Sequence, residues 1–173
     1  MIHSDAPLPE PWLRGTMTEA PAVIRGVLHA LELAREDARK WCGGLTDSQL
    51  HARPAGLPSV AFHLRHIAGS IDRLLTYAEG RSLSGGQLQA LKAENSTDGS
   101  TPKLLAELES VIAQASGRVR ALGSQDLEAP RTVGKKQLPT TLGGLLIHVA
   151  DHTQRHVGQA ITTAKLVSAS AVF

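Results

Sequence analysis

The sequence predicts an all-α protein: a four-helix bundle with a long connection between helices and a short additional helix. Only 3% of the residues are aromatic while 42% are hydrophobic, so leucine, alanine, valine and isoleucine must build the core. That composition suits helices better than strands. Four segments of about twenty residues also carry apolar side chains at three- and four-residue spacing. Helices of this kind bury their apolar faces against one another, which predicts a bundle.

The first two long helices are bounded by capping and stop residues. We predict the first over residues 19–41, with Thr18 as its N-cap and the Gly43-Gly44 pair as its end. A connector follows, in which residues 46–49 could start a short helical turn. The second long helix is expected to begin after Ser59 and to reach about residue 79, because Gly80 follows.

The second half of the chain is predicted in the same way. Residues 84–95 form the short additional helix, although two glycines weaken its pattern. The third long helix covers residues 101–122, with Pro102 in its first turn and Gly123 as its stop. Residues 130–139, bounded by prolines, are interpreted as an irregular or extended loop. The fourth long helix starts near residue 140 and continues to about residue 167.

Length and composition limit the possible functions. The 173 residues fit one domain, residues 1–173, with residues 1–17 as an irregular N-terminal segment. No segment approaches the ~18 consecutive apolar residues of a membrane span, and residues 1–11 lack a signal-peptide pattern, so a cytoplasmic protein is expected. The net charge is +2 without a basic stripe, which argues against nucleic-acid binding. The single cysteine, Cys42, excludes an intramolecular disulfide and is interpreted as a small core residue.

Histidine is the residue type that points to chemistry. Two histidines lie in the second predicted helix, His63 and His66, and three in the fourth, His148, His152 and His156. Residues four apart lie on one face of a helix, one turn from each other, so His152 and His156 can reach one metal ion. A third histidine from a facing helix would complete a three-histidine site with open positions. Such open sites are typical of catalytic zinc and related metals.

The residues alone leave the third ligand open. By helical phase His63 lies nearer the centre of its apolar stripe than His66, which gives His63 a slight preference. Histidines on an apolar face also occur as hydrogen-bonded core residues without any metal. Gln159, one turn beyond His156, could orient a ligand or a bound water, and it could equally be an ordinary residue at the edge of the helix.

Two segments, 59–75 and 146–159, resemble the signature segments of the DinB-like (YfiT-type) superfamily, and residues 46–54 resemble the stretch before its second helix. The strongest element is His152-x-x-x-His156-x-Gly-Gln159. The resemblance implies that His66, His152 and His156 are the metal ligands. It also implies a four-helix bundle, one divalent ion (nickel or zinc, with iron as a further option) and a possible homodimer. His63, His148 and Gln159 then become candidates for supporting a ligand or lining a pocket.

The same resemblance suggests a function. Some enzymes of this superfamily transfer low-molecular-weight thiols such as bacillithiol or mycothiol, and one branch isomerises maleylpyruvate using mycothiol. We therefore expect a metal-dependent thiol S-transferase that acts on a small electrophilic substrate. The alternatives are a metal-dependent hydrolase and a non-catalytic metal-binding stress-response or sensor protein.

Carboxylates and arginines also lie near the histidines in the sequence. A hydrolase would need a carboxylate beside the metal, yet Asp72 and Asp151 lie on other parts of their helices. Asp72 is expected to face solvent or to pair with Arg73 or a neighbouring helix. Arg65, Arg73 and Arg155 could bind an anionic substrate, but each is interpreted first as part of a solvated helix face.

Overall fold

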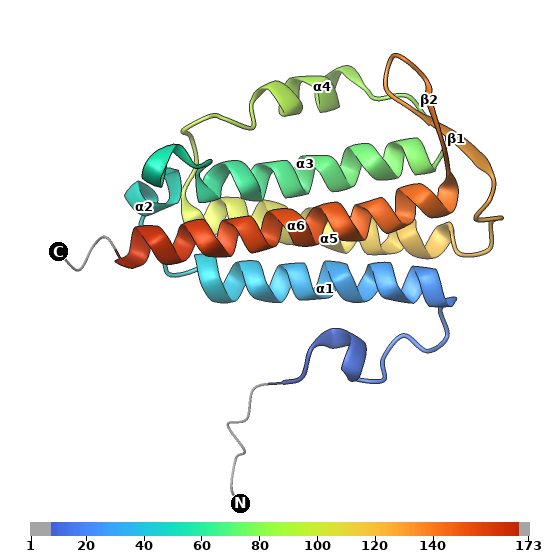
Figure 1. Cartoon of the computed structure of the whole chain (residues 1–173), viewed down its shortest axis with the longest axis horizontal. Coiled ribbons are helices and arrows are strands. Elements are labelled where there is room, and N and C mark those ends of the chain that lie inside the picture. The colour runs from blue at the N-terminus through green and yellow to red at the C-terminus, as the bar shows by residue number, and fades with distance from the viewer. Residues whose placement is uncertain (1–7, 170–173) are drawn as a thin grey trace, which may run out of the picture.

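Four long helices make up most of the protein, as the sequence predicts. The computed structural model describes residues 8–169. The long helices are α1 (Ala22–Cys42), α3 (Val60–Ala78), α5 (Thr101–Ala121) and α6 (Leu142–Ala169). Two short helices, α2 (Asp47–His51) and α4 (Gly85–Lys92), lie in the connections on either side of α3 (Figure 1). The predicted four-helix bundle with a short additional helix is confirmed.

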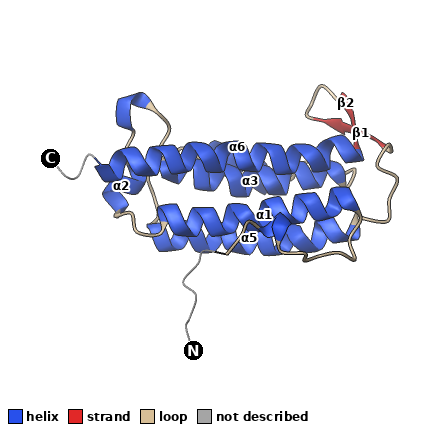
Figure 2. Cartoon of the chain, turned by 60° about the horizontal axis from the view of Figure 1, so that its bottom comes forward, coloured by secondary structure: helices blue, strands red, loops and turns tan. Residues whose placement is uncertain are grey.

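The long helices form two layers, α3 with α6 and α1 with α5 (Figure 2). Each helix contacts one neighbour in its own layer and one in the other layer. The long helices do not simply alternate in direction, because α3 and α5 run the same way along the bundle (Figure 1). The connection that contains α4 carries the chain back from the end of α3 to the start of α5. The long connection is therefore a crossover, and it leaves α6 antiparallel to α3, the helix it contacts most extensively.

Aliphatic side chains from all four helices fill the space between the layers. Members of this core that are almost completely buried include Leu28, Leu31, Leu64, Ile67, Ile71, Leu108, Leu142 and Leu146. Cys42 is also fully buried, so its interpretation as a small core residue is confirmed. Burial raises the pKa of its thiol to about 11, which leaves very little thiolate at neutral pH.

The connection that contains α4 lies outside the bundle. Ser84 and Gln87 close a capping box at the start of α4, and no residue of α4 is buried. Gln87 also donates hydrogen bonds to Asp72 and Thr76 of α3. Polar contacts at its two ends, and not an apolar face, hold this segment against α3.

The segment predicted as an irregular or extended loop over residues 130–139 contains a β-hairpin, whose strand pairing the prediction missed. Strands β1 (Pro130–Val133) and β2 (Leu138–Thr141) pair antiparallel, with Pro130 opposite Thr141 and Val133 opposite Leu138. A four-residue turn joins them, in which Gly134 and Gln137 have positive φ. Both strands of a two-stranded hairpin are edge strands. Edge strands tolerate proline, so Pro130 and Pro139 do not prevent the pairing.

The start of the first helix also differs from its prediction. Helix α1 begins at Ala22 with Pro21 as the N-cap, whereas Thr18 lies in a preceding turn. Proline disfavours helical geometry in the residue before it, so the helix cannot extend back through Ala20. Of the N-terminal segment predicted to be irregular, residues 1–7 lie outside the described residues, and Pro11–Leu13 form a 3-10 turn.

Among residues 8–169, no helix combines the length and apolar character that crossing a membrane requires.

Candidate metal centre

Helix α3 supplies two of the histidines from its first two turns. Its N-cap is Ser59, whose Oγ accepts a hydrogen bond from the backbone N–H of Phe62. This cap fixes where the helix begins and therefore which way His63 and His66 point. Both side chains face α6, where each lies within hydrogen-bonding distance of a histidine of that helix.

The imidazoles of His66, His152 and His156 converge. One ligand nitrogen from each lies within 4.8 Å of the other two, and the ring centroids are 4.3–5.1 Å apart. Nε2 of His66 is 2.9 Å from Nε2 of His152. Two nitrogens at this distance need a proton or a cation between their lone pairs. Three imidazole nitrogens that face one point are the donor set that zinc, nickel or iron accepts.

Two of these rings are held in the neutral form that binds a metal. Burial, together with the nearby histidines, lowers the pKa of His152 to about 4. Burial and the proximity of His66 also lower the pKa of His156. Neutral imidazole offers a lone pair, so these two groups do not have to lose a proton at neutral pH before they bind a cation.

His63 lies directly beside this cluster. Its side chain is buried, and its Nδ1 is 3.2 Å from Nδ1 of His156. Burial is the main reason why its pKa falls to about 4, and His156 and His66 act in the same direction. Helical phase gave His63 a slight preference as the third ligand, but the convergent set contains His66.

The structure adds a carboxylate that sequence reasoning missed. Glu94, just after α4, is only 5% exposed, and its Oε2 lies 2.7 Å from Nδ1 of His66. Its Oε1 accepts a hydrogen bond of 2.8 Å from Arg73. Burial alone would raise the pKa of Glu94, but the contacts with His66 and Arg73 outweigh it and hold the pKa below its ordinary value. Glu94 is therefore ionised at neutral pH.

His148 and Gln159, the other two candidate residues, lie at the edge of the histidine cluster. His148 is 46% exposed and lies 3.6 Å from Asp151, although its ring is 5.2 Å from that of His152. Gln159 is exposed and, with His63, lines a pocket of about 330 Å³ between α6 and the start of α3. A larger cavity of about 700 Å³ lies between α3, α5 and the α4 connection, and none of its described lining residues is a histidine.

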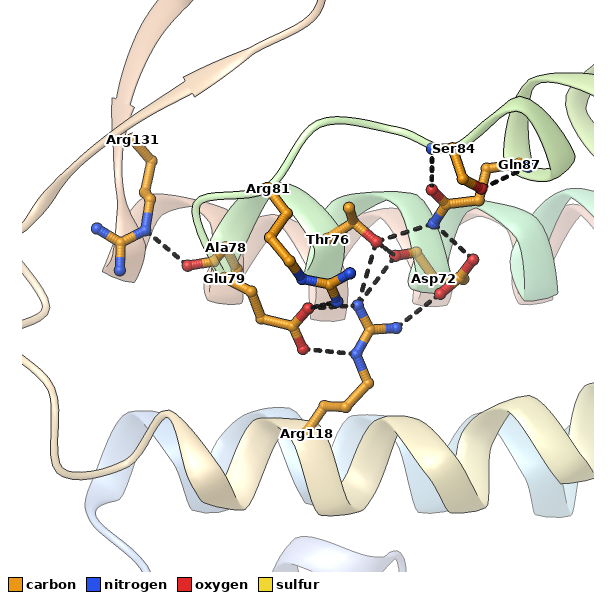
Figure 3. Close-up of polar contacts among 9 residues, drawn as sticks. All are labelled: Asp72, Thr76, Ala78, Glu79, Arg81, Ser84, Gln87, Arg118 and Arg131. Atoms are coloured by element: carbon orange, nitrogen blue, oxygen red, sulfur yellow. Dashed lines mark hydrogen bonds and ion pairs between the residues drawn. The ribbon is translucent and has the colours of Figure 1, made fainter.

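Asp72 and Asp151, the carboxylates considered as a general base for hydrolysis, form ion pairs with arginines. Asp72 forms an ion pair with Arg118 of α5, 2.7 Å long, and accepts a hydrogen bond from Gln87 (Figure 3). Asp151 is exposed and pairs with Arg155 one turn away. The expected pairing of Asp72 with a neighbouring helix is confirmed.

The three arginines differ from one another. Arg155 belongs to an exposed ion pair on α6, as expected for a solvated face. Arg65 donates hydrogen bonds to the backbone carbonyls of Ser96 and Asp98, so it ties the long connection to α3. The interpretation was wrong for Arg73, which is only 8% exposed and binds Glu94. Its sequence position could not indicate burial, because the partner is 21 residues away.

Comparisons with known proteins agree with this architecture. A structure of YfiT from Bacillus subtilis matches with a TM-score of 0.62 and 19% identity, over 84% of this chain and 87% of that one. That protein is described as a probable metal-dependent hydrolase with an unusual four-helix bundle topology. A comparison with curated protein sequences gives no match. The family model of the DinB superfamily matches residues 30–160, more than half of the chain. The protein is therefore a member of the DinB superfamily.

Proposed function

We propose that this protein is a metal-dependent enzyme in which His66, His152 and His156 hold one divalent ion. The observation that carries the proposal is the convergence of three imidazoles, with their ligand nitrogens within 4.8 Å of one another. Three protein ligands leave coordination positions open, which is the pattern of a catalytic site and not of a closed structural one. When bound, the ion would supply Lewis acidity that lowers the pKa of a coordinated thiol or water.

We further propose a low-molecular-weight thiol as the nucleophile and a small electrophile as its substrate. A thiol coordinated to a metal ion would be deprotonated outright, whereas attack by water is assisted by a free carboxylate acting as general base. Among residues 8–169, the carboxylate that contacts one of the three histidines is Glu94, beside His66, and both of its oxygens are already engaged. Because this carboxylate is not free to accept a proton as general base, the surroundings of the cluster support a thiol more than they support water.

The pocket of about 330 Å³ is the proposed location of the substrate. It is lined by Leu57 and Pro58 on one side and by Gln159 and Thr162 of α6 on another. His63 forms part of its wall and contacts His156, so the pocket adjoins the histidines. Its apolar side would hold the body of a small molecule, while the amide of Gln159 could orient a polar group.

Hydrolysis is the second candidate, because the structurally similar YfiT is described as a probable metal-dependent hydrolase. In that case the thiol would be replaced by water. The two functions share the metal site and differ in the nucleophile, so one experiment can separate them.

The test starts with elemental analysis of untagged wild-type protein and of the His66→Ala and His156→Ala variants. We expect about one equivalent of metal in the wild type and none in either variant. The metal-loaded wild type is then incubated with monobromobimane plus bacillithiol or mycothiol, and separately with nitrophenyl esters without thiol. Metal-dependent thiol conjugation supports the transferase, and ester cleavage without thiol supports the hydrolase. Bound metal without any turnover would favour a sensor, and a wild type that binds no metal would refute the proposal.

A further inference from the structure

A buried ion pair lies directly behind one of the three histidines. Arg73 and Glu94 are 8% and 5% exposed, and they meet through a hydrogen bond of 2.8 Å between Nη2 and Oε1. The other oxygen of Glu94 lies 2.7 Å from Nδ1 of His66. A charged pair is costly to bury unless its hydrogen bonds are satisfied. Here both carboxylate oxygens have a partner, and one of the two partners belongs to the metal centre.

Glu94 also determines which nitrogen of His66 faces the cluster. Oε1 of Glu94 accepts from Arg73 and its Oε2 faces Nδ1 of His66, so this contact places the proton of the imidazole on Nδ1. The neutral ring then has its lone pair on Nε2, the atom that lies 2.9 Å from Nε2 of His152. A carboxylate in this position fixes both the tautomer and the orientation of a metal-binding imidazole.

Gly69 provides the space for this arrangement. It lies on α3 between His66 and Arg73, about one turn from each. A Cβ atom at position 69 would lie 2.6 Å from Nη1 of Arg73 and 3.0 Å from Oε1 of Glu94. Real Cβ atoms do not approach other atoms to 2.6 Å, so any side chain here would displace the guanidinium. Glycine is unfavourable inside a helix, but at this position the lack of a Cβ leaves room for the ion pair.

The guanidinium of Arg73 donates a hydrogen bond to Glu94 and, within the described part of the chain, leaves a second buried N–H group unbonded. Its Nη1 is buried and has no hydrogen-bond partner among the described residues. A buried arginine placed only to tie two segments together would be expected to use more of its five donors. Among residues 8–169, the hydrogen bond that Arg73 makes is the one to Glu94.

We propose that Gly69, Arg73 and Glu94 act together as positioning residues that hold His66 ready for a metal ion. This inference rests on the proposed metal centre, since it assigns these three residues a role toward one of its ligands. Glu94 holds the Nδ1–H of His66, Arg73 holds Glu94 in place as a carboxylate, and Gly69 leaves room for both. A merely structural ion pair would attach the α4 connection to α3 without affecting metal binding.

The main test is metal affinity, measured by competition of Zn²⁺ or Ni²⁺ between the purified protein and a chromophoric chelator. We expect Glu94→Gln to weaken binding by about 10–100-fold, the usual effect of losing such a partner. Gly69→Ala should weaken binding by at least about 10-fold. Thermal unfolding of each variant, recorded in parallel, shows whether the affinity is measured on folded protein.

Two matched controls separate this role from general effects. Asp72→Asn removes a carboxylate from α3, the helix that carries His66 and Gly69. This carboxylate pairs with Arg118 and touches no histidine. Gly26→Ala places a methyl group in the second turn of α1, where nothing lies within 4 Å. Both controls should bind metal within about twofold of the wild type. Wild-type affinity in folded Glu94→Gln and Gly69→Ala would overturn the inference while leaving the metal centre intact.

A second measurement does not require metal. Long-range ¹H–¹⁵N NMR of the metal-free protein reports the ring tautomer of each histidine. We expect His66 to carry its proton on Nδ1 in the wild type and to lose this preference in Glu94→Ala. If the wild type binds no metal, the proposed function fails, and this spectrum alone decides whether Glu94 positions His66. An unchanged tautomer in Glu94→Ala would refute the positioning role.

Discussion

The guanidinium of Arg118 on α5 binds the carboxylate of Glu79, the C-cap residue of α3, through two hydrogen bonds, from Nε to Oε1 at 2.7 Å and from Nη2 to Oε2 at 2.9 Å (Figure 3). The same guanidinium also reaches Asp72, so one arginine joins two turns of α3 to α5. Bidentate pairs of this kind are stronger than single surface ion pairs. Arg118 thus links the two layers of the bundle at the end of α3.

This pair predicts a loss of stability in acid. The hydrogen bonds from Arg118 are the main cause that lowers the pKa of Glu79 below its ordinary value of 4.5; burial opposes them and Arg81 supports them. Because the pKa is lower in the folded protein, the pair contributes fully above about pH 4.5, and its contribution declines as the pH falls through the folded value. Glu79→Gln should reduce the free energy of unfolding by about 1–2 kcal/mol at pH 7.

Urea unfolding of both proteins at pH 7 and pH 3 checks this prediction. The difference between wild type and Glu79→Gln should shrink toward zero at the lower pH. Glu107→Gln, an exposed position on α5, is the control and should cost less than about 0.5 kcal/mol. An equal difference at both pH values would show that the charge of Glu79 is not what stabilises the contact.

Two histidines one turn apart on α6 should respond differently to substitution. His152 belongs to the convergent set, whereas His148 is 46% exposed and lies beside Asp151. His152→Ala removes a ligand, and we expect the metal content to fall to near zero. His148→Ala should keep the wild-type metal content and affinity. Elemental analysis after dialysis makes the comparison, and loss of metal from His148→Ala would mean that the site extends farther along α6.

The N-caps of two long helices should differ in their importance. The hydroxyl of Ser59 caps α3, whereas Ser100, at the same position of α5, makes no side-chain capping bond. Ser59→Ala should therefore lower the free energy of unfolding by about 1 kcal/mol. Ser100→Ala should lower the free energy of unfolding by a few tenths of a kcal/mol at most. Denaturant unfolding of the two variants tests this, and equal losses would contradict it.

The thiol of Cys42 should be nearly inert in the native protein. It is fully buried, and burial raises its pKa to about 11 from an ordinary value of 9.0. At pH 8 the thiolate population is then on the order of 100-fold smaller than in an exposed cysteine. Reaction with a chromogenic disulfide should be at least that much slower in the native protein than in urea. Comparable rates in both conditions would show that the α1 end opens readily.

The four long helices could be predicted because their signals are local. Apolar spacing, capping residues and stop glycines lie within each segment, and Ser59, Gly80 and Thr101 mark boundaries that the structure reproduces. The hairpin could not be predicted in this way, since its strands have only four residues each and contain prolines. Pairing between the two strands determines that element, and pairing is not visible in either strand alone.

The candidate site was only partly predictable for a similar reason. Helical spacing brings His152 and His156 together, but phase within α3 could not separate His63 from His66. Both face α6, where His63 contacts His156 while His66 approaches both His152 and His156. Glu94 gave no signal, because a glutamate after an exposed short helix resembles a surface residue. Its burial depends on Arg73 and His66, which precede it by 21 and 28 residues.

The hairpin also constrains which changes of chain length the protein can tolerate. Strand β2 ends at Thr141 and α6 begins at the next residue, while Leu142 and Gly143 donate hydrogen bonds to the carbonyls of Ala129 and Leu127. The start of α6 is therefore anchored. Deleting one residue between this anchor and His152 would turn the following histidines by about 100° around the helix axis, away from α3. Residues inserted at the hairpin tip, by contrast, would extend into solvent and leave the histidine spacing intact.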